Sequence, residues 1–204
     1  MDKQDKIVIF AGIVILIISI AGIVYHEKTY VATGEEVKKT EYVVSWIEYS
    51  DEIVDNGFVG RDGWGASYSL DIDYPSEGKE YGVITAVDII LEWSDNLDFH
   101  GLILPWNWSD LVEMNVKIDE LGFSQSAKGY GKIELHVEKG QPQDFTKEAE
   151  NETQLYEYLA QNALNEVNCK INLSITPKPR FFDRGNDFTI RIVYHYYVPE
   201  IKVS

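Results

Sequence analysis

The sequence predicts a mainly β protein, in which an N-terminal transmembrane helix precedes an antiparallel β-sandwich of jelly-roll or immunoglobulin-like type with one inserted amphipathic helix. Three observations predict this architecture. Residues 7–25 form an uncharged apolar run, about seven later segments alternate apolar and polar residues, and residues 146–164 show helical spacing. Alternation with period two is typical of strands with one solvated face, and many short strands separated by turn residues indicate a sandwich.

The transmembrane prediction rests on Ile7–Tyr25, nineteen residues without a charge or a proline. A helix of that length is about 28 Å long, close to the hydrocarbon thickness of a bilayer. The run exceeds the apolar region of an ordinary signal peptide and continues into His26, Glu27 and Lys28 without a small-residue cleavage pattern. We expect a retained anchor, and a cleaved signal peptide is the alternative.

The flanks of this run predict how the chain is arranged about the membrane. Residues 1–6 carry Lys3 and Lys6, and basic residues favour the cytoplasmic side. Residues 26–39 form a polar spacer, and residues 40–204 are expected to form one extracytoplasmic domain. The sequence therefore predicts a single-pass protein of the cell membrane, with the lipid bilayer and other membrane or surface proteins as partners.

Composition excludes one class of partner and one kind of crosslink. The net charge is -16, and residues 1–26 contribute none of it because two Asp and two Lys cancel there. A domain this acidic repels nucleic acid. Cys169 is the single cysteine, so no intrachain disulfide forms, and its place in an alternating apolar series predicts a buried strand residue.

The strands are predicted in chain order from alternation and from β-branched and aromatic residues. They cover residues 40–49, 67–74, 81–93, 111–118, 131–138, 169–175 and 187–198. Residues 81–93 are the most apolar and are expected to form a central strand. Residues 51–65 are rich in Gly, Asp and Asn, which predicts an irregular loop.

One helix is predicted at Thr146–Leu164, a segment without Gly or Pro. Helical spacing places one set of side chains on a single face: Leu155, Tyr158, Leu159, Asn162 and Ala163. Glutamates in the first turns complement the helix dipole. The helix is expected to cover an edge or an open end of the sandwich.

The densest polar cluster follows the central strand and contains Asp95, Asn96 and Asp98. Carboxylate and amide oxygens are the ligands of Ca²⁺, so this loop is a candidate metal site and Ca²⁺ the candidate cofactor. The spacing is not that of an EF-hand. An ordinary turn rich in Asp and Asn is the alternative.

Trp106 and Trp108 flank Asn107 on the same loop. Exposed tryptophans stack on sugar rings or insert at protein interfaces, so the pair is a candidate binding site. The alternative is that one tryptophan closes the end of the core. Asn-x-Ser/Thr occurs at Asn107, Asn151 and Asn172, which predicts glycosylation of an extracytoplasmic surface.

Motifs for catalysis are missing from the sequence. It contains no HExxH, CxxC, P-loop or Gly-x-Ser-x-Gly pattern. His136 and His195 occupy polar phases of predicted strands and are expected at the surface. The sequence therefore predicts a protein that is not an enzyme and has no cofactor apart from the candidate Ca²⁺.

Three short motifs carry a resemblance to a known group of proteins. A strand ends in Leu91-Glu92-Trp93-Ser94-Asp95, a second strand follows at Leu111–Ile118, and Asp183–Phe188 precedes the long aromatic strand that contains Tyr194–Tyr197. This pattern resembles small single-pass surface proteins of Thermoplasmata-type archaea. The resemblance implies an anchored jelly-roll-like ectodomain of unassigned function and no catalytic residues. The helix at 146–164 and Met114 depart from the pattern.

These observations favour a non-enzymatic, membrane-anchored interaction module, or an accessory subunit of a membrane protein complex. The alternative is a surface domain that binds carbohydrate through Trp106 and Trp108, or Ca²⁺ through the loop at Asp95–Asp98.

Overall fold

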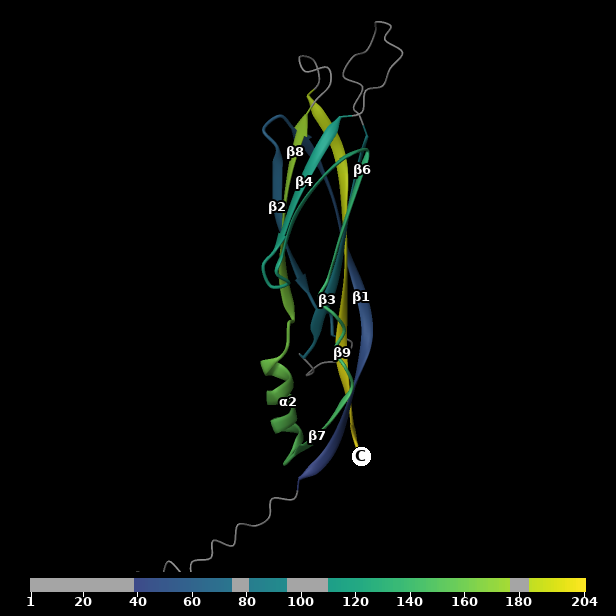
Figure 1. Cartoon of the computed structure of the whole chain (residues 1–204), viewed down its shortest axis with the longest axis vertical. Helices are drawn as coiled ribbons and strands as arrows, with labels where there is room; N and C mark the ends of the chain where they lie inside the picture. The colour runs from purple at the N-terminus through teal and green to yellow at the C-terminus, as the bar shows by residue number, and fades with distance from the viewer. Residues whose placement is uncertain (1–38, 75–80, 95–109, 177–183) are drawn as a thin grey trace, which may run out of the picture. The chain divides into compact units, whose positions relative to one another are not determined.

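The computed structural model describes residues 39–74, 81–94, 110–176 and 184–204, and the chain from Thr40 to Ser204 forms one compact unit (Figure 1). The predicted membrane helix at Ile7–Tyr25 lies outside these ranges. Within them, no helix has the length and apolar character needed to cross a bilayer.

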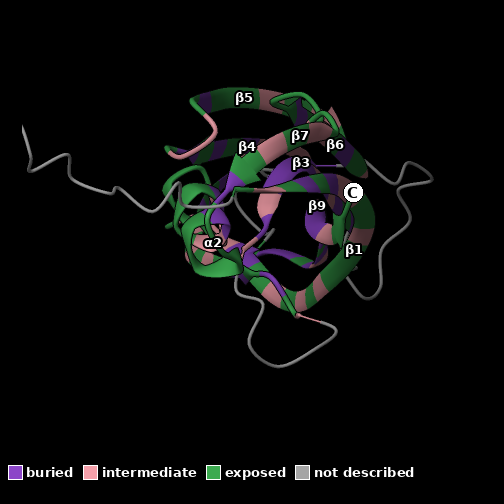
Figure 2. Ribbon diagram, turned by 90° about the horizontal axis from the view of Figure 1, so that it is seen from below, coloured by how far each residue is buried: buried purple, intermediate pink, exposed green. Residues whose placement is uncertain are grey.

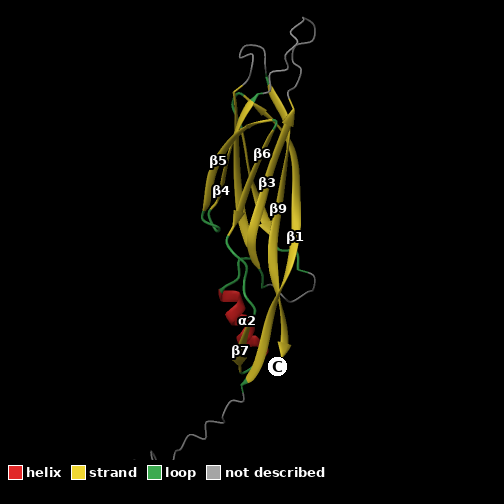
Figure 3. Cartoon of the chain, turned by 45° about the vertical axis from the view of Figure 1, so that its right-hand side comes forward, coloured by secondary structure: helices red, strands yellow, loops and turns green. Residues whose placement is uncertain are grey.

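The described elements are nine strands and one helix (Figure 3). In chain order they are β1 (Thr40–Gly60), β2 (Trp64–Asp71), β3 (Val83–Ser94), β4 (Leu111–Ile118), β5 (Phe123–Tyr130), β6 (Lys132–Glu138), β7 (Phe145–Ala149), α2 (Glu152–Gln161), β8 (Glu166–Thr176) and β9 (Gly185–Val203).

The strands form two antiparallel sheets with the orders β6-β3-β9-β1-β7 and β2-β8-β4-β5. Apart from β7, strands from the two halves of the chain pair in a nested series: β1 with β9, β2 with β8, β3 with β6, and β4 with β5. Nested pairing of eight strands over two sheets is the arrangement of a jelly roll. The predicted β-sandwich is thus confirmed, with jelly-roll-like topology.

The main core lies between the two sheets and follows the predicted alternation. In β4 the buried residues are Val112, Met114, Val116 and Ile118, while the residues between them are more exposed. Cys169 and Ile171 of β8 face the same core. Cys169 is fully buried, as the alternation predicted.

A second, smaller core lies where α2 packs near the start of β1 (Figure 1). Its buried members are Tyr42, Val44, Ala149, Leu155 and Leu159. Leu155 and Leu159 are the apolar helix face that the sequence predicted. The helix therefore extends the sandwich with a core of its own.

The predicted limits of this helix, 146–164, are wrong at both ends. Phe145–Ala149 forms β7, which pairs with Thr40–Val44 of β1. Sheet pairing and burial of Ala149 outweigh helix propensity there, and Asn151 then caps a helix that begins at Glu152. At the other end the helix stops at Gln161, because Leu164 leaves it to bridge Val83.

The predicted loop at 51–65 is also wrong, because β1 continues to Gly60 and pairs with β9 along almost its whole length. The glycine at 57 meets a packing need, since a Cβ there would lie 2.5 Å from Cζ of Phe188. Strand β5 was not predicted, because only Phe123 among its residues is buried. It is a polar edge strand whose register is set by the hairpin with β4.

Strand β1 lies at the rim of the sandwich, where it alternates between exposed and intermediate residues (Figure 2). One side of it pairs with β9. The other side pairs with β7 from Thr40 to Val44 and no further. Beyond Trp46 that second side has no strand partner among the described residues. We call residues 47–58 of this side the free edge of β1.

Candidate functional site on the outer face of the five-stranded sheet

The candidate loop residues Asp95, Asn96, Asp98, Trp106, Asn107 and Trp108 all lie outside the described residues. The metal, carbohydrate and glycan predictions for this loop therefore stay predictions. The described chain resumes at Asp110, which is buried and accepts a hydrogen bond from Asn186 at 3.1 Å.

The other two sequon asparagines are described, and both are exposed. Asn151 caps α2, and its Oδ1 accepts a hydrogen bond from the Gln154 amide at 2.9 Å. Asn172 lies in the middle of β8, opposite Gly65 and Asn115 on the neighbouring strands. Both positions are at the surface, where a glycan needs its asparagine to be, and the glycosylation itself stays a prediction.

Five titratable side chains lie close together on the outer face, the surface of the five-stranded sheet that points away from the four-stranded sheet. Asp88 of β3 lies between two histidines: Oδ1 is 2.8 Å from His136 Nδ1 of β6, and Oδ2 is 3.5 Å from His195 Nε2 of β9. Glu138 lies 3.8 Å from His136, and Glu48 of β1 lies 3.5 Å from His195. We call these five residues the histidine–carboxylate cluster.

The charge of His136 depends on this arrangement. The hydrogen bond with Asp88 raises the pKa of His136, and the nearby charges of Asp88 and Glu138 act in the same direction. The side chain is 56% exposed, so solvent screens much of the interaction. The cluster is thus a set of ion pairs that strengthens as His136 takes up a proton.

Metal binding is not what this arrangement favours. Its members come from four strands, and neighbouring strands are about 4.8 Å apart. In the part of the chain that the structure describes, no three His, Cys, Asp or Glu side chains are placed to hold a metal ion. The cluster ties β6, β3, β9 and β1 together across the face.

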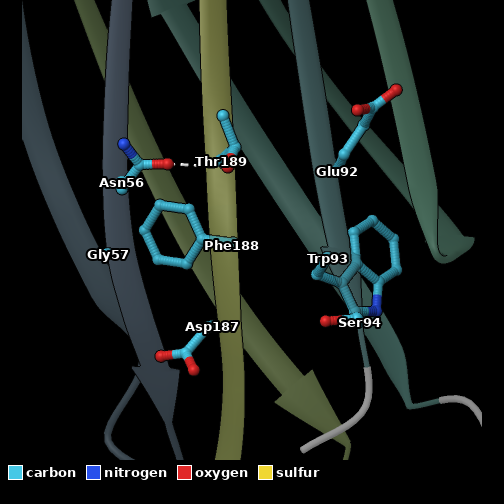
Figure 4. A pocket seen from close by; sticks show the side chains of 8 residues that line it. All are labelled: Asn56, Gly57, Glu92, Trp93, Ser94, Asp187, Phe188 and Thr189. Carbon is cyan, nitrogen blue, oxygen red and sulfur yellow. Dashed lines mark hydrogen bonds between the residues drawn. The ribbon is translucent and has the colours of Figure 1, made fainter.

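Further along the same face, a hollow of about 630 Å³ opens over β1, β3 and β9 (Figure 4). Asn56 Oδ1 accepts a hydrogen bond from Thr189 Oγ1 at 2.7 Å, and Glu92 lies on the other side (Figure 4). Beneath them, Phe188 packs edge-on against Trp64, with ring centroids 4.8 Å apart. The lining offers amide, hydroxyl and carboxylate groups to a polar ligand or to a protein surface.

Nucleophilic chemistry has little support among the described side chains. Burial raises the pKa of the Cys169 thiol to about 12, so the thiolate is scarce at neutral pH. Burial and the neighbouring Asp51 raise the pKa of Tyr194 to about 12. Its hydroxyl instead donates a hydrogen bond to the carbonyl oxygen of Asp71 at 2.8 Å, which helps close the sandwich.

Sequence reasoning placed His136 and His195 at the surface and did not bring them together. The sequence signal for these residues was that each histidine falls at a polar position in the alternating pattern of its strand. Asp88 interrupts a very apolar strand, which is a similarly weak signal of a surface position. Joining the three requires the order β6-β3-β9, which only the folded sheet provides.

Comparison with known proteins yields likeness of fold alone. No protein-family model matches the chain, and no curated protein matches it. Among solved structures, the BFDV capsid protein is similar at 7% identity, with 77% of this chain and 99% of that chain covered and a TM-score of 0.35. Desmodium yellow mottle tymovirus gives 12% identity, coverage of 79% and 85%, and a TM-score of 0.28. Turnip yellow mosaic virus gives 10%, 78% and 84%, and 0.25.

All three TM-scores lie below 0.5, so the jelly-roll-like topology rests on the strand order of this chain and not on these matches. The function is therefore inferred from the residues of the chain itself.

Proposed function

We propose that the chain is a non-enzymatic, membrane-anchored extracytoplasmic interaction module, or an accessory subunit of a membrane protein complex. Residues 7–25 are the anchor in this proposal, and the jelly-roll-like domain at 40–204 presents binding surfaces outside the membrane. The nineteen-residue apolar run supports the anchor, and the acidic composition disfavours nucleic acid as a partner.

The observation that carries the proposal is the free edge of β1. An unpaired strand edge presents backbone N–H and C=O groups that another chain can pair with. Here the edge is long, and Val54 and Phe58 beside it are 47% and 46% exposed. Exposed apolar side chains next to unpaired backbone groups are typical of surfaces that bind protein.

Affinity purification of the tagged full chain from detergent-solubilised membranes tests the interaction. We expect partner proteins to be recovered in fixed stoichiometry, with an unrelated single-pass protein as the control. Recovery of the chain as a clean monomer contradicts the accessory-subunit proposal.

The anchor has a separate test. After an alkaline carbonate wash the full chain should stay with the membrane pellet, whereas a chain that lacks residues 1–26 should be released. Release of the full chain contradicts the anchor. The affinity purification then tests the binding surface by itself.

A further inference from the structure

We propose that the free edge of β1 binds an extended segment of a partner protein, which adds to the sheet as an antiparallel strand. The segment carries basic residues opposite Glu48 and Glu52 and apolar residues opposite Val54 and Phe58. This inference rests on the proposed function and specifies the chemistry of the partner.

The direction of the backbone groups comes from three hydrogen bonds. The amides of Trp46, Glu52 and Asn56 donate to the side chains of Asp144, Asp51 and Asp55 at 3.0, 2.7 and 2.8 Å. These amides therefore point away from β9, and in an antiparallel ladder so do those of every second residue. The amides of the remaining even-numbered residues face the free edge, and no described residue bonds them: Glu48, Ser50, Val54 and Phe58.

The same side of β1 already accepts a strand within this chain. Strand β7 pairs there with Thr40–Val44, and Trp46 is held by Asp144 just beyond. The free edge continues in line from that pairing until the turn that joins Gly60 to Gly63. Its twelve residues span about 36–40 Å at about 3.3 Å per residue, which is more than the length of an ordinary strand.

The side chains along the edge define what an added strand would carry. All even-numbered residues from Glu48 to Phe58 are exposed on the outer face. Directly opposed residues on neighbouring strands contact each other, so Val54 and Phe58 favour apolar partners and the two glutamates favour basic ones. Glu52 lies 3.0 Å from Arg191, and its side chain remains 52% exposed. The Glu48 side chain is 54% exposed.

A second copy of this chain is a poor occupant of the edge. Pairing β1 with its own copy would bring the carboxylates of two acidic strands together, in a chain of net charge -16. Asp51 and Asp55 also cap two edge amides, a device that protects strand edges from self-association. Both carboxylates also accept hydrogen bonds from tyrosine hydroxyls, Asp51 from Tyr194 and Asp55 from Tyr68, so each keeps a donor when an added strand takes its amide.

The test uses an eleven-residue peptide and the full chain in a mild detergent, measured by isothermal titration calorimetry. The peptide carries valine opposite Phe58 and Val54, lysine opposite Glu52 and Glu48, and serine or threonine elsewhere. We expect saturable binding that weakens as salt is raised. A peptide with glutamate in place of each lysine should bind at least tenfold more weakly.

Ser50→Pro blocks the edge selectively. The Ser50 amide faces the free edge, so proline removes no hydrogen bond to β9, and proline is tolerated in edge strands. We expect at least a tenfold loss of peptide affinity, while the matched Ser50→Ala variant binds like the parent. If Ser50→Pro unfolds the domain, Val54→Glu tests the same edge by adding a like charge in place of an apolar contact.

Absence of peptide binding to the parent chain overturns the inference, and so does equal binding to Ser50→Ala and to the edge-blocked variant. If the glutamate peptide binds as tightly as the lysine peptide, the inference that the partner segment is basic is overturned. Affinity purification separates this failure from that of the proposed function: partners that are still recovered with Ser50→Pro contradict the edge and leave the interaction module standing.

Discussion

Asp88 shows at the scale of one residue how the sheet joins groups that the sequence keeps apart. Its two carboxylate oxygens lie beside His136 and His195, which come from strands on either side of β3. Each residue follows the polar phase of its own strand. The folded state places both histidines next to a carboxylate, and the hydrogen bond with Asp88 raises the pKa of His136.

His136 should stabilise the fold more in acid than in base. Its pKa is raised in the folded state, so its contribution is fully present below about pH 6.5, the ordinary value, and is lost as pH rises through the raised pKa. His136→Gln should therefore lower the melting temperature more at pH 5.5 than at pH 8.5.

The control for this prediction is the same substitution in an Asp88→Asn background, where the pH dependence of the difference should shrink. His195 also contacts Asp88, and Glu138 also faces His136, so the double-mutant cycle isolates one pair within the histidine–carboxylate cluster. An equal effect of His136→Gln at both pH values in the parent chain contradicts the prediction.

Gly57 should be sensitive to a single added methyl group. A Cβ there would lie 2.5 Å from Phe188 Cζ, and that ring packs on Trp64. We expect Gly57→Ala to destabilise the domain by about 1–3 kcal/mol in denaturant unfolding. Gly60→Ala, whose Cβ would meet its nearest atoms at 3.4 Å, is the control and should cost less. Equal losses at both positions would count against a tight Gly57 contact.

At the scale of elements, α2 is defined by its first turn. Asn151 Oδ1 accepts from the Gln154 amide, and Gln154 Oε1 accepts from the Glu150 amide at 2.9 Å. This reciprocal pair ends β7 and begins the helix within two residues. Leu155 and Leu159 then cover the second core.

Asn151 has two predicted roles, which substitution can separate. Asn151→Ala removes the cap and should cost about 0.5–2 kcal/mol in unfolding free energy. Asn151→Asp keeps a capping oxygen and removes the sequon, so its stability should stay near that of the parent chain. Both variants are compared as unglycosylated protein by urea unfolding. A large loss with Asp as well as Ala contradicts the capping role.

The sequence predicted elements best where apolar residues alternate strictly. Strand β4 was predicted at its observed limits, because each buried residue there is apolar and the residues between the buried ones are polar. Strand β5 and the second half of β1 were missed, because their places in the fold depend on pairing with β4 and β9. The histidine–carboxylate cluster and the free edge of β1 depend on strand order, which a single sequence does not encode locally.

At the scale of the whole molecule, a predicted anchor precedes a jelly-roll-like domain whose longest strand, β1, has no strand partner on one side beyond Trp46 among the described residues. The chain enters the domain at Thr40, where β7 closes that edge, and the free edge follows along β1. The second core holds the start of β1 through Tyr42 and Val44, and Tyr49 and Ile53 of the free edge pack against the main core. A strand that is held in this way is a suitable template for another chain, because little of it must be ordered on binding.

Native mass spectrometry of the full chain, extracted in mild detergent from the membranes that contain it, tests whether the free edge of β1 holds a partner protein. We expect a complex in which the chain is bound to a different protein in fixed stoichiometry, and a loss of that protein with Ser50→Pro but not with Ser50→Ala. A chain that is monomeric, or that fails to fractionate with membranes, would contradict the account.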